Sequence, residues 1–239
     1  MGDWLSAGRS RRVERGLLQI LPGLSVAGLG AVEVSAQSYA ALDSRVIGFQ
    51  PTFEAPAPVV PLAIDVNAWN GDGVLVVGRV KAHTAFRADI ESGLCKMLAI
   101  GLGKQRGAET NHARGLAETI PAVASVLLAS GKVTMGLGLV ENAYHKLHTV
   151  RATGPDGFHD TDRSLLKLAN ELLPRVPFQD LDLLIVDQIG KNVSGSGMDY
   201  NIVGMWRRIG GPQVPNYKRI AVLGITPQSE GNGMGMGIA

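Results

Sequence analysis

The stretch from His83 to His112 concentrates the side chains that could do chemistry in this chain. His83 directly follows GDGVLVVGRVKA, whose apolar run is bounded by glycines and is typical of a buried strand. An imidazole that titrates near neutral pH at the end of such a strand is a candidate acid–base group. Lys96 and His112 follow it, and they are a candidate ligand-binding lysine and a candidate metal ligand.

Lys96 belongs to a predicted helix that carries Leu94, Met97 and Leu98 at helical spacing. Ser92 is the predicted N-cap, which places Lys96 in or just beyond the first turn. A lysine beside free backbone N–H groups and the positive end of the helix dipole is suited to bind an anion such as phosphate. If the lysine is also desolvated, it loses its proton more easily and becomes a nucleophile.

Three motifs resemble those of the nickel-pincer lactate racemase family, and more closely those of its uncharacterised lactate-racemase-like relatives. Residues 93–96 (Gly-Leu-Cys-Lys) match the family's Gly-x-x-Lys, and residues 111–112 match its Asn-His pair. Far downstream, Gln188 and Lys191 match its Gln-x-x-Lys pair. The resemblance covers residues 10–239.

The resemblance implies a cofactor, the nickel-pincer nucleotide. Lys96 would carry it covalently, Gly93 and Arg87 would contribute to its binding, and His112 would ligate the nickel. Imidazole suits divalent nickel in a planar nitrogen and sulfur environment. The pincer supplies sulfur donors of its own, so a chain with one cysteine can still hold the metal by this scheme.

The implied activity is racemisation or epimerisation of a small 2-hydroxy acid by hydride and proton transfer. His83 would exchange the hydroxyl proton, although it lies further upstream of Lys96 than in the racemase. Gln188 and Lys191 would hold the substrate carboxylate and polarise a developing carbonyl oxygen.

Two departures from the family pattern lie upstream of His83. The family's second histidine lies in a Gly-x-His segment, whereas MGDWLSAGRSRR contains no histidine, and the phosphate-binding Asp-x-x-Arg motif is absent. The alternative hypothesis is therefore a non-catalytic or truncated member that binds a nucleotide or a partner without turnover. A nicotinamide-dependent dehydrogenase ranks last, because no G-x-G-x-x-G turn joins a strand to a helix.

Two further groups have alternative interpretations. Cys95 is either a nucleophile or soft metal ligand beside Lys96, or a small core residue, and the second interpretation is favoured. His145 and His148 lie near Glu141 and could imitate a metal site, but no third histidine accompanies them.

The elements that position these residues are strands and helices in alternation, which predicts an α/β domain with a mostly parallel sheet flanked by helices. The predicted strands lie near residues 44–49, before His83, and at 132–140, 181–186 and 219–225; the predicted helices span 115–130, with Pro121 as a kink or a new start, and 162–173. In such sheets ligands bind beyond the carboxyl ends of the strands. His83 follows one strand and Lys191 another, so we expect one site there.

The composition is typical of a folded protein with one domain over residues 1–239, of which 1–60 are expected to be the remnant of an N-terminal subdomain. Hydrophobic residues make up 45% and charged residues 18% of the 239 residues. A net charge of +2, without a basic stripe bearing aromatics, predicts no nucleic-acid partner. The single cysteine excludes an intramolecular disulfide and fits the cytoplasm.

The N-terminal region leaves one alternative open. Residues 16–32 carry no charge and follow a basic stretch, as in a signal peptide. Pro22 and several glycines interrupt the run, and the resemblance includes it in the domain. We therefore expect a cytoplasmic protein without a membrane partner.

Overall fold

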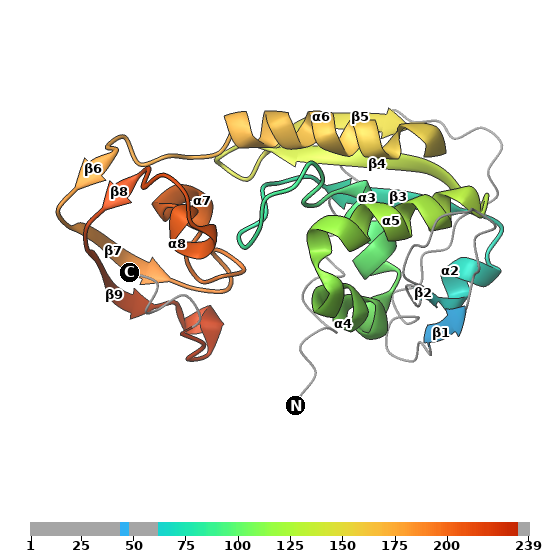
Figure 1. Ribbon diagram of the computed structural model, residues 1–239, viewed down its shortest axis with the longest axis horizontal. Coiled ribbons are helices and arrows are strands. Elements are labelled where there is room, and N and C mark those ends of the chain that lie inside the picture. The colour runs from blue at the N-terminus through green and yellow to red at the C-terminus, as the bar shows by residue number, and fades with distance from the viewer. Residues whose placement is uncertain (1–43, 48–61, 234–239) are drawn as a thin grey trace.

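The computed structural model describes residues 44–47 and 62–233, and Figure 1 shows a larger part formed up to the end of α6 and a smaller part after it. The larger part contains β1 (Ser44–Ile47), β2 (Leu62–Asp65), α2 (Val66–Asn70), β3 (Val74–Arg79), α3 (Leu94–Lys96), the π-helical turn η2 (Met97–Gly101), α4 (Lys104–Arg114), α5 (Leu116–Ala129), β4 (Val133–Glu141), β5 (Leu147–Thr153), η3 (Pro155–Gly157) and α6 (Phe158–Glu171). The smaller part contains β6 (Asp180–Leu181), β7 (Leu184–Ile189), α7 (Tyr200–Val203), α8 (Trp206–Ile209), β8 (Asn216–Tyr217), β9 (Ile220–Ile225) and η4 (Pro227–Ser229).

The larger part is built on the three-stranded sheet β3-β4-β5. The strands β3 and β4 are parallel, because the chain between them crosses over through α3, α4 and α5. The strands β4 and β5 are antiparallel, since residues 142–146 are far fewer than the dozen or more that a parallel crossover needs. The hairpin therefore turns the last strand of this sheet against the direction of the other two.

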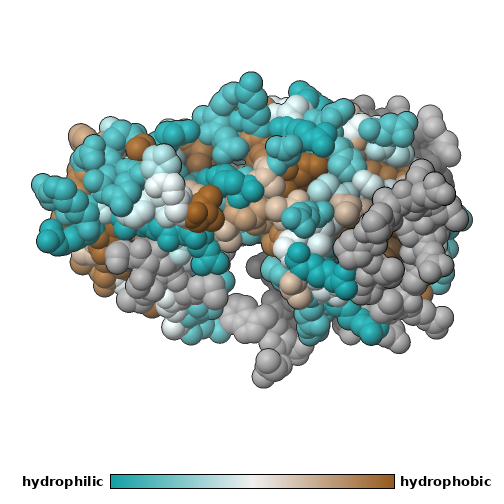
Figure 2. All heavy atoms as spheres, in the orientation of Figure 1, coloured by the Kyte–Doolittle hydropathy of each residue, from teal (hydrophilic) through white to brown (hydrophobic). Residues whose placement is uncertain are grey.

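Helix α6 packs along β4 and β5, and α3 packs beside it (Figure 1). The close approach depends on small residues in β4, since a Cβ on Gly138 would lie 2.6 Å from Leu165 Cδ1 of α6. The hydrophobic core of the larger part contains Leu94, Leu98 and Ile120, which are all fully buried. The outer surface over α6 is mainly hydrophilic in Figure 2.

The smaller part contains two short parallel pairs, β6 with β8 and β7 with β9. The backbone N–H of Lys218 donates to Leu181 O, and that of Leu184 donates to Arg219 O, so the two pairs continue into one another. Ile189, Met198, Val203 and Tyr217 form the core of this part.

The architecture corrects the expected sheet. The chain is mixed α/β, but its described strands form four small sheets with both parallel and antiparallel pairs, not one mostly parallel sheet. The predicted strand at 181–186 is divided between β6 and β7, and α6 begins before the predicted helix start. The predicted helix at 115–130 is confirmed as α5, which runs through Pro121 and does not restart there.

Of residues 1–60, only 44–47 lie within the described residues, where β1 agrees with the predicted strand near 44–49. The uncharged stretch at 16–32 lies outside them, so the signal-peptide alternative stays a prediction. Among the helices that the structure describes, none combines the length and the apolar character needed to cross a bilayer.

The start of α3 joins this helix to α6 through one buried carboxylate. Asp162 Oδ1 accepts from the backbone N–H of Leu94 at 2.9 Å, and Asp162 Oδ2 accepts from that of Cys95 at 2.8 Å. Gly93 is the N-cap, with a φ of 91°, and a Cβ there would lie 2.3 Å from Asp162 Oδ1. The prediction that Ser92 caps the helix is wrong, because its hydroxyl bonds the backbone of Lys81 instead.

Gly93→Ala is expected to lower the free energy of unfolding by about 3 kcal/mol, since the new methyl group collides with Asp162 in a left-handed backbone conformation. Chemical denaturation monitored by circular dichroism measures this loss. Gly131→Ala is the matched control, because Gly131 has a φ of 72° and no atom within 4 Å of its would-be Cβ. The control should lose only about 1 kcal/mol of backbone strain; equal losses in the two variants would contradict the role of the junction.

Candidate functional site

His83 lies at the start of the loop that follows β3, and this loop wraps around the carboxylate of Glu91. Glu91 Oε2 accepts from the backbone N–H of His83 at 2.7 Å, and Oε1 accepts from that of Ala88 at 3.2 Å. The Glu91 side chain is almost fully buried. A buried carboxylate that takes two backbone donors fixes the loop, so His83 is held in place by a residue the sequence did not single out.

The hydrogen bonding of the His83 ring leaves its Nε2 as a hydrogen-bond donor. Its Nδ1 accepts from the backbone N–H of Ala85 at 3.1 Å, so in the neutral ring the proton lies on Nε2. Burial and then the positive charge of Lys96 lower the pKa of His83 to about 4. The ring is therefore neutral at pH 7, and the expectation of a group titrating near neutrality is wrong for the unliganded chain.

Lys96 lies in the first turn of α3, as predicted, and is partly buried. Burial and the nearby charge of Lys81 lower its pKa, which favours the nucleophilic amine form. The helix N-terminus itself does not offer free N–H groups to a phosphate, because Asp162 occupies those of Leu94 and Cys95. The carboxyl group of Asp162 therefore occupies the position at this helix N-terminus where a phosphate was expected.

His112 lies on α4 with its ring exposed to solvent. Its Nδ1 is 2.6 Å from the carbonyl oxygen of Ala108, so Nδ1–H donates and Nε2 keeps its lone pair outward. A backbone carbonyl that fixes the tautomer in this way is a common second-shell arrangement for metal-binding histidines. The charge of His112 also contributes to the lowered pKa of His83, so the two side chains lie within electrostatic reach of one another.

Asn111, the neighbour of His112, is buried and connects α4 to the preceding turn. Its Nδ2 donates to Gly107 O at 2.7 Å and to Ala99 O at 3.3 Å. Its Oδ1 has no hydrogen-bond partner among the residues that the structure describes. The Asn-His pair thus combines a structural residue with an exposed imidazole.

Lys81 is the cation that sequence reasoning missed, although it alternates with His83 directly after β3. We call Lys81, His83, Lys96 and His112 the basic cluster. Electrostatic coupling joins its members, since the charges of the two lysines and of His112 all lower the pKa of His83. The predicted residues His83, Lys96 and His112 are therefore brought to one region, together with an additional lysine.

The smaller part of the chain meets this region through loop contacts. Ser196 Oγ donates to Thr84 Oγ1 at 2.8 Å, and Asn201 Nδ2 donates to the carbonyl oxygen of His83 at 3.3 Å. Arg87 donates to Asn201 Oδ1 as well as to His83 O. The loops after β3 and β7 therefore meet, although β3 and β7 belong to separate sheets and not to the single sheet edge that was expected.

Arg87 was expected to bind the cofactor, and its guanidinium is instead used within the protein. It donates to the carbonyl oxygens of His83 and Phe86, lies 3.5 Å from Glu91 Oε2, and contacts Asn201. These contacts give Arg87 a structural role, which is to connect the His83 loop to the smaller part.

Gln188 lies in β7, and Lys191 lies in the glycine-rich loop that joins β7 to α7. Gln188 is exposed within β7, where it pairs with Gly224. Lys191 Nζ donates to Gly195 O at 2.6 Å, and its backbone N–H donates to Ser229 Oγ at 2.9 Å. These bonds hold the glycine-rich loop, so the contacts of Lys191 are explained by loop structure before any substrate is considered.

Cys95 is a core residue, because it is fully buried and burial raises the pKa of its thiol. The favoured interpretation is confirmed. His145 is exposed with its Nδ1 4.0 Å from Glu141 Oε2, and His148 Nδ1 contacts Thr149. Over the described residues, no three His, Cys, Asp or Glu side chains group to hold a metal ion.

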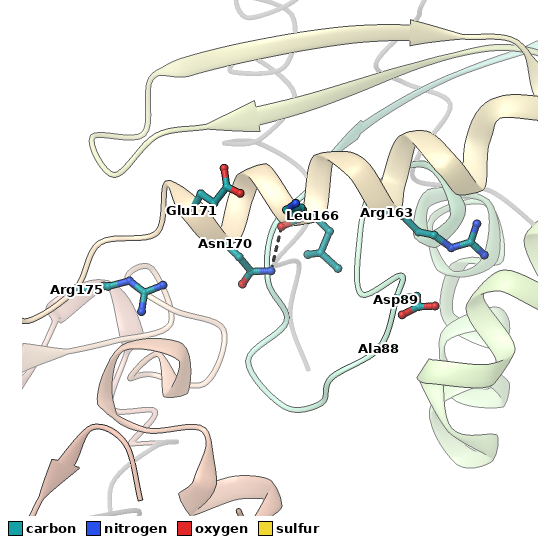
Figure 3. A pocket seen from close by; sticks show the side chains of 8 residues that line it. Ala88, Asp89, Arg163, Leu166, Asn170, Glu171 and Arg175 are labelled. Atoms are coloured by element: carbon teal, nitrogen blue, oxygen red, sulfur yellow. Dashed lines mark hydrogen bonds between the residues drawn. The ribbon is translucent and has the colours of Figure 1, made fainter. Parts of the chain in front are cut away.

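A pocket of about 540 Å³ lies apart from the basic cluster, between α6 and the loop at Ala88 and Asp89 (Figure 3). Its lining mixes cations with carboxylates: Ala88, Asp89, Arg163, Leu166, Lys167, Asn170, Glu171 and Arg175. None of the predicted site residues lines it, and Arg163 already pairs with Asp160 at 2.9 Å. The candidate site is therefore the basic cluster, which contains three of the predicted site residues.

Neither known protein families nor characterised proteins give a significant match to this chain. The site is therefore interpreted from its own residues.

Lys96→Gln is expected to raise the pKa of His83 from about 4 towards its ordinary value of 6.5. The substitution removes the positive charge that, among the neighbouring charges, lowers this pKa most. Titration of the imidazole nitrogens by NMR measures the pKa and also reports which nitrogen is protonated. Lys167→Gln, on the exposed side of α6, should leave the pKa unchanged. A His83 pKa that stays constant or falls in Lys96→Gln would contradict the cluster.

Proposed function

We propose that this chain is a lactate-racemase-like protein that binds a nickel-pincer nucleotide and acts on a small 2-hydroxy acid. The observation that supports this best is the basic cluster, which joins a lysine of lowered pKa, a histidine with an available Nε2 and a neutral donor histidine. Such a set suits an anionic ligand that is attached to an amine and carries a metal. The resemblance of residues 93–96 and 111–112 names that ligand.

The residues fit the cofactor at two points. The lowered pKa of Lys96 favours the uncharged amine that forms an amide or thioamide link, and His112 Nε2 is oriented as a ligand by the bond at Nδ1. The described residues offer no cluster of protein ligands, so the remaining donors would be the sulfurs of the cofactor. When bound, the nickel-pincer nucleotide would supply the hydride acceptor for the 2-hydroxy acid.

His83 would act on the hydroxyl group of the substrate. In the unliganded arrangement the neutral ring carries its proton on Nε2, so it could donate to a substrate hydroxyl or stabilise a developing oxyanion. To accept the hydroxyl proton, the ring must give up the bond from Ala85 or turn. Attachment at Lys96 removes a positive charge, which raises the pKa of His83 and makes it a stronger base.

Gln188 and Lys191 are retained in the proposal as the groups that orient the substrate carboxylate. Lys191 would have to exchange the carbonyl oxygen of Gly195 for a substrate oxygen. Lys191 and Gly195 are both exposed, so a substrate oxygen could reach the Lys191 ammonium group from solvent.

The second candidate function is ligand binding without turnover. It is favoured by the tautomer of His83, which is a donor with no free lone pair, and by the low pKa, which makes the ring a weak base. Racemisation of an enantiomerically pure 2-hydroxy acid by the loaded chain, measured by chiral chromatography, separates the two candidates.

The cofactor assignment predicts distinct phenotypes for Lys96 and His112. After co-expression with the pincer-synthesis enzymes, the wild type should show an added mass and bound nickel. Lys96→Ala should lose both, whereas His112→Ala should keep the added mass and lose most of the nickel, because it removes a ligand and leaves the attachment point. Intact mass spectrometry and metal analysis measure these quantities.

Lys167→Ala is the matched control for Lys96→Ala, since its side chain is exposed on α6, and it should behave as the wild type. Wild-type protein with no added mass and no nickel would rule out the proposed cofactor for this chain.

A further inference from the structure

The backbone of Lys81 is held in place by the hydroxyl group of Ser92, which both accepts and donates a hydrogen bond. The backbone N–H of Lys81 donates to Ser92 Oγ at 2.7 Å, and the Ser92 hydroxyl donates to Lys81 O at 2.6 Å. Ser92 is buried and directly precedes Gly93, the first residue of the α3 junction. The α-carbon of Lys81 is therefore fixed beside the helix turn that carries Lys96, while its side chain is exposed.

The ammonium group of Lys81 makes no hydrogen bond and no ion pair with the described residues, and the same holds for Lys96. Two carboxylates face Lys81, those of Asp199 and Glu141. Both are engaged elsewhere: Glu141 pairs with Arg79 at 2.5 Å. Asp199 caps α7 by accepting from Asn201 N at 2.8 Å and Asn201 Nδ2 at 2.7 Å.

The basic cluster thus combines two lysines without close counter-ions, a ring N–H on His83 and the exposed ring of His112. Like charges held near one another repel: desolvation lowers the pKa of both lysines, and the charge of Lys81 lowers that of Lys96 further. An anionic oxygen group placed among them removes this repulsion and gains charge-assisted hydrogen bonds. The mixed pocket of Figure 3 lacks this imbalance, because Asp89 and Glu171 lie among its cations.

We propose that Lys81 binds an oxyanion group, a carboxylate or a phosphate, of a ligand that lies against Lys96 and His83. The proposal uses the same region as the proposed function and identifies the group that receives the ligand's negative charge. It does not depend on covalent attachment at Lys96. Because Ser92 fixes the backbone, Lys81 presents its charge without the ordering cost of a mobile loop.

The test uses the full chain expressed without the pincer-synthesis enzymes, with inorganic pyrophosphate and L-lactate as probes. Titration at low ionic strength is followed by backbone amide NMR shifts, which report both affinity and location. We expect saturable binding with the largest shifts around Lys81 and Ser92. Lys81→Gln should weaken binding about tenfold or more through loss of a charge-assisted bond, Lys81→Arg should keep most of it, and Lys167→Gln should match the wild type.

The choice of probe identifies the source of the oxyanion. Lys81-dependent binding of pyrophosphate alone would indicate a phosphate of a nucleotide, and that of L-lactate alone would indicate a substrate carboxylate; both results support the proposal. Absence of saturable binding, shifts centred on the Arg163 pocket, or equal affinity in a folded Lys81→Gln would overturn it. The location of the shifts in the wild type decides the matter if that variant melts early.

Because this chain carries no adduct, the outcome is independent of nickel loading. Anion binding without an adduct at Lys96 in the co-expression experiment would refute the proposed function and leave this inference standing. An adduct at Lys96 without Lys81-dependent anion binding would support the proposed function and refute this inference.

Discussion

The carboxylate of Asp162 is the contact on which the candidate site depends. It accepts the backbone N–H groups of Leu94 and Cys95, and so fixes the start of α3 against α6 and the sheet. Burial raises the pKa of Asp162, and the two backbone donors oppose that shift. Lys96, the last residue of α3, takes its position from this junction. Gly93 leaves the space that the carboxylate occupies.

The local elements could largely be predicted from the sequence, whereas the contacts between them could not. Apolar runs identified β3 and β9, and helical spacing identified α5 and α6, because these signals depend on near neighbours. The bond from Leu94 to Asp162 joins residues 68 positions apart, so no local pattern reveals it. The same holds for Ser196 and Asn201, which meet the His83 loop from the smaller part. The sequence predicted a mostly parallel sheet, whereas the short hairpin between β4 and β5 makes that pair antiparallel.

Where the structure describes the chain, the acidic side chains of this region bond to the backbone, whereas those of the two lysines of the basic cluster do not. Glu91, Asp162 and Asp199 all accept backbone N–H groups, which is the arrangement that keeps buried carboxylates satisfied. The lysines at 81 and 96 have no such partners among the described residues. A surplus of positive potential therefore persists where the two loops meet, and it arises because the nearby acids serve the backbone.

The bond from Asn201 to the carbonyl oxygen of His83 also has a thermodynamic consequence. It attaches the smaller part to His83, a member of the basic cluster, and Arg87 reinforces this attachment. Occupancy of the region and the docking of the two parts are therefore linked functions. By reciprocity, a ligand that favours one arrangement of His83 stabilises the contact with Asn201 by the same free energy that the contact lends to binding.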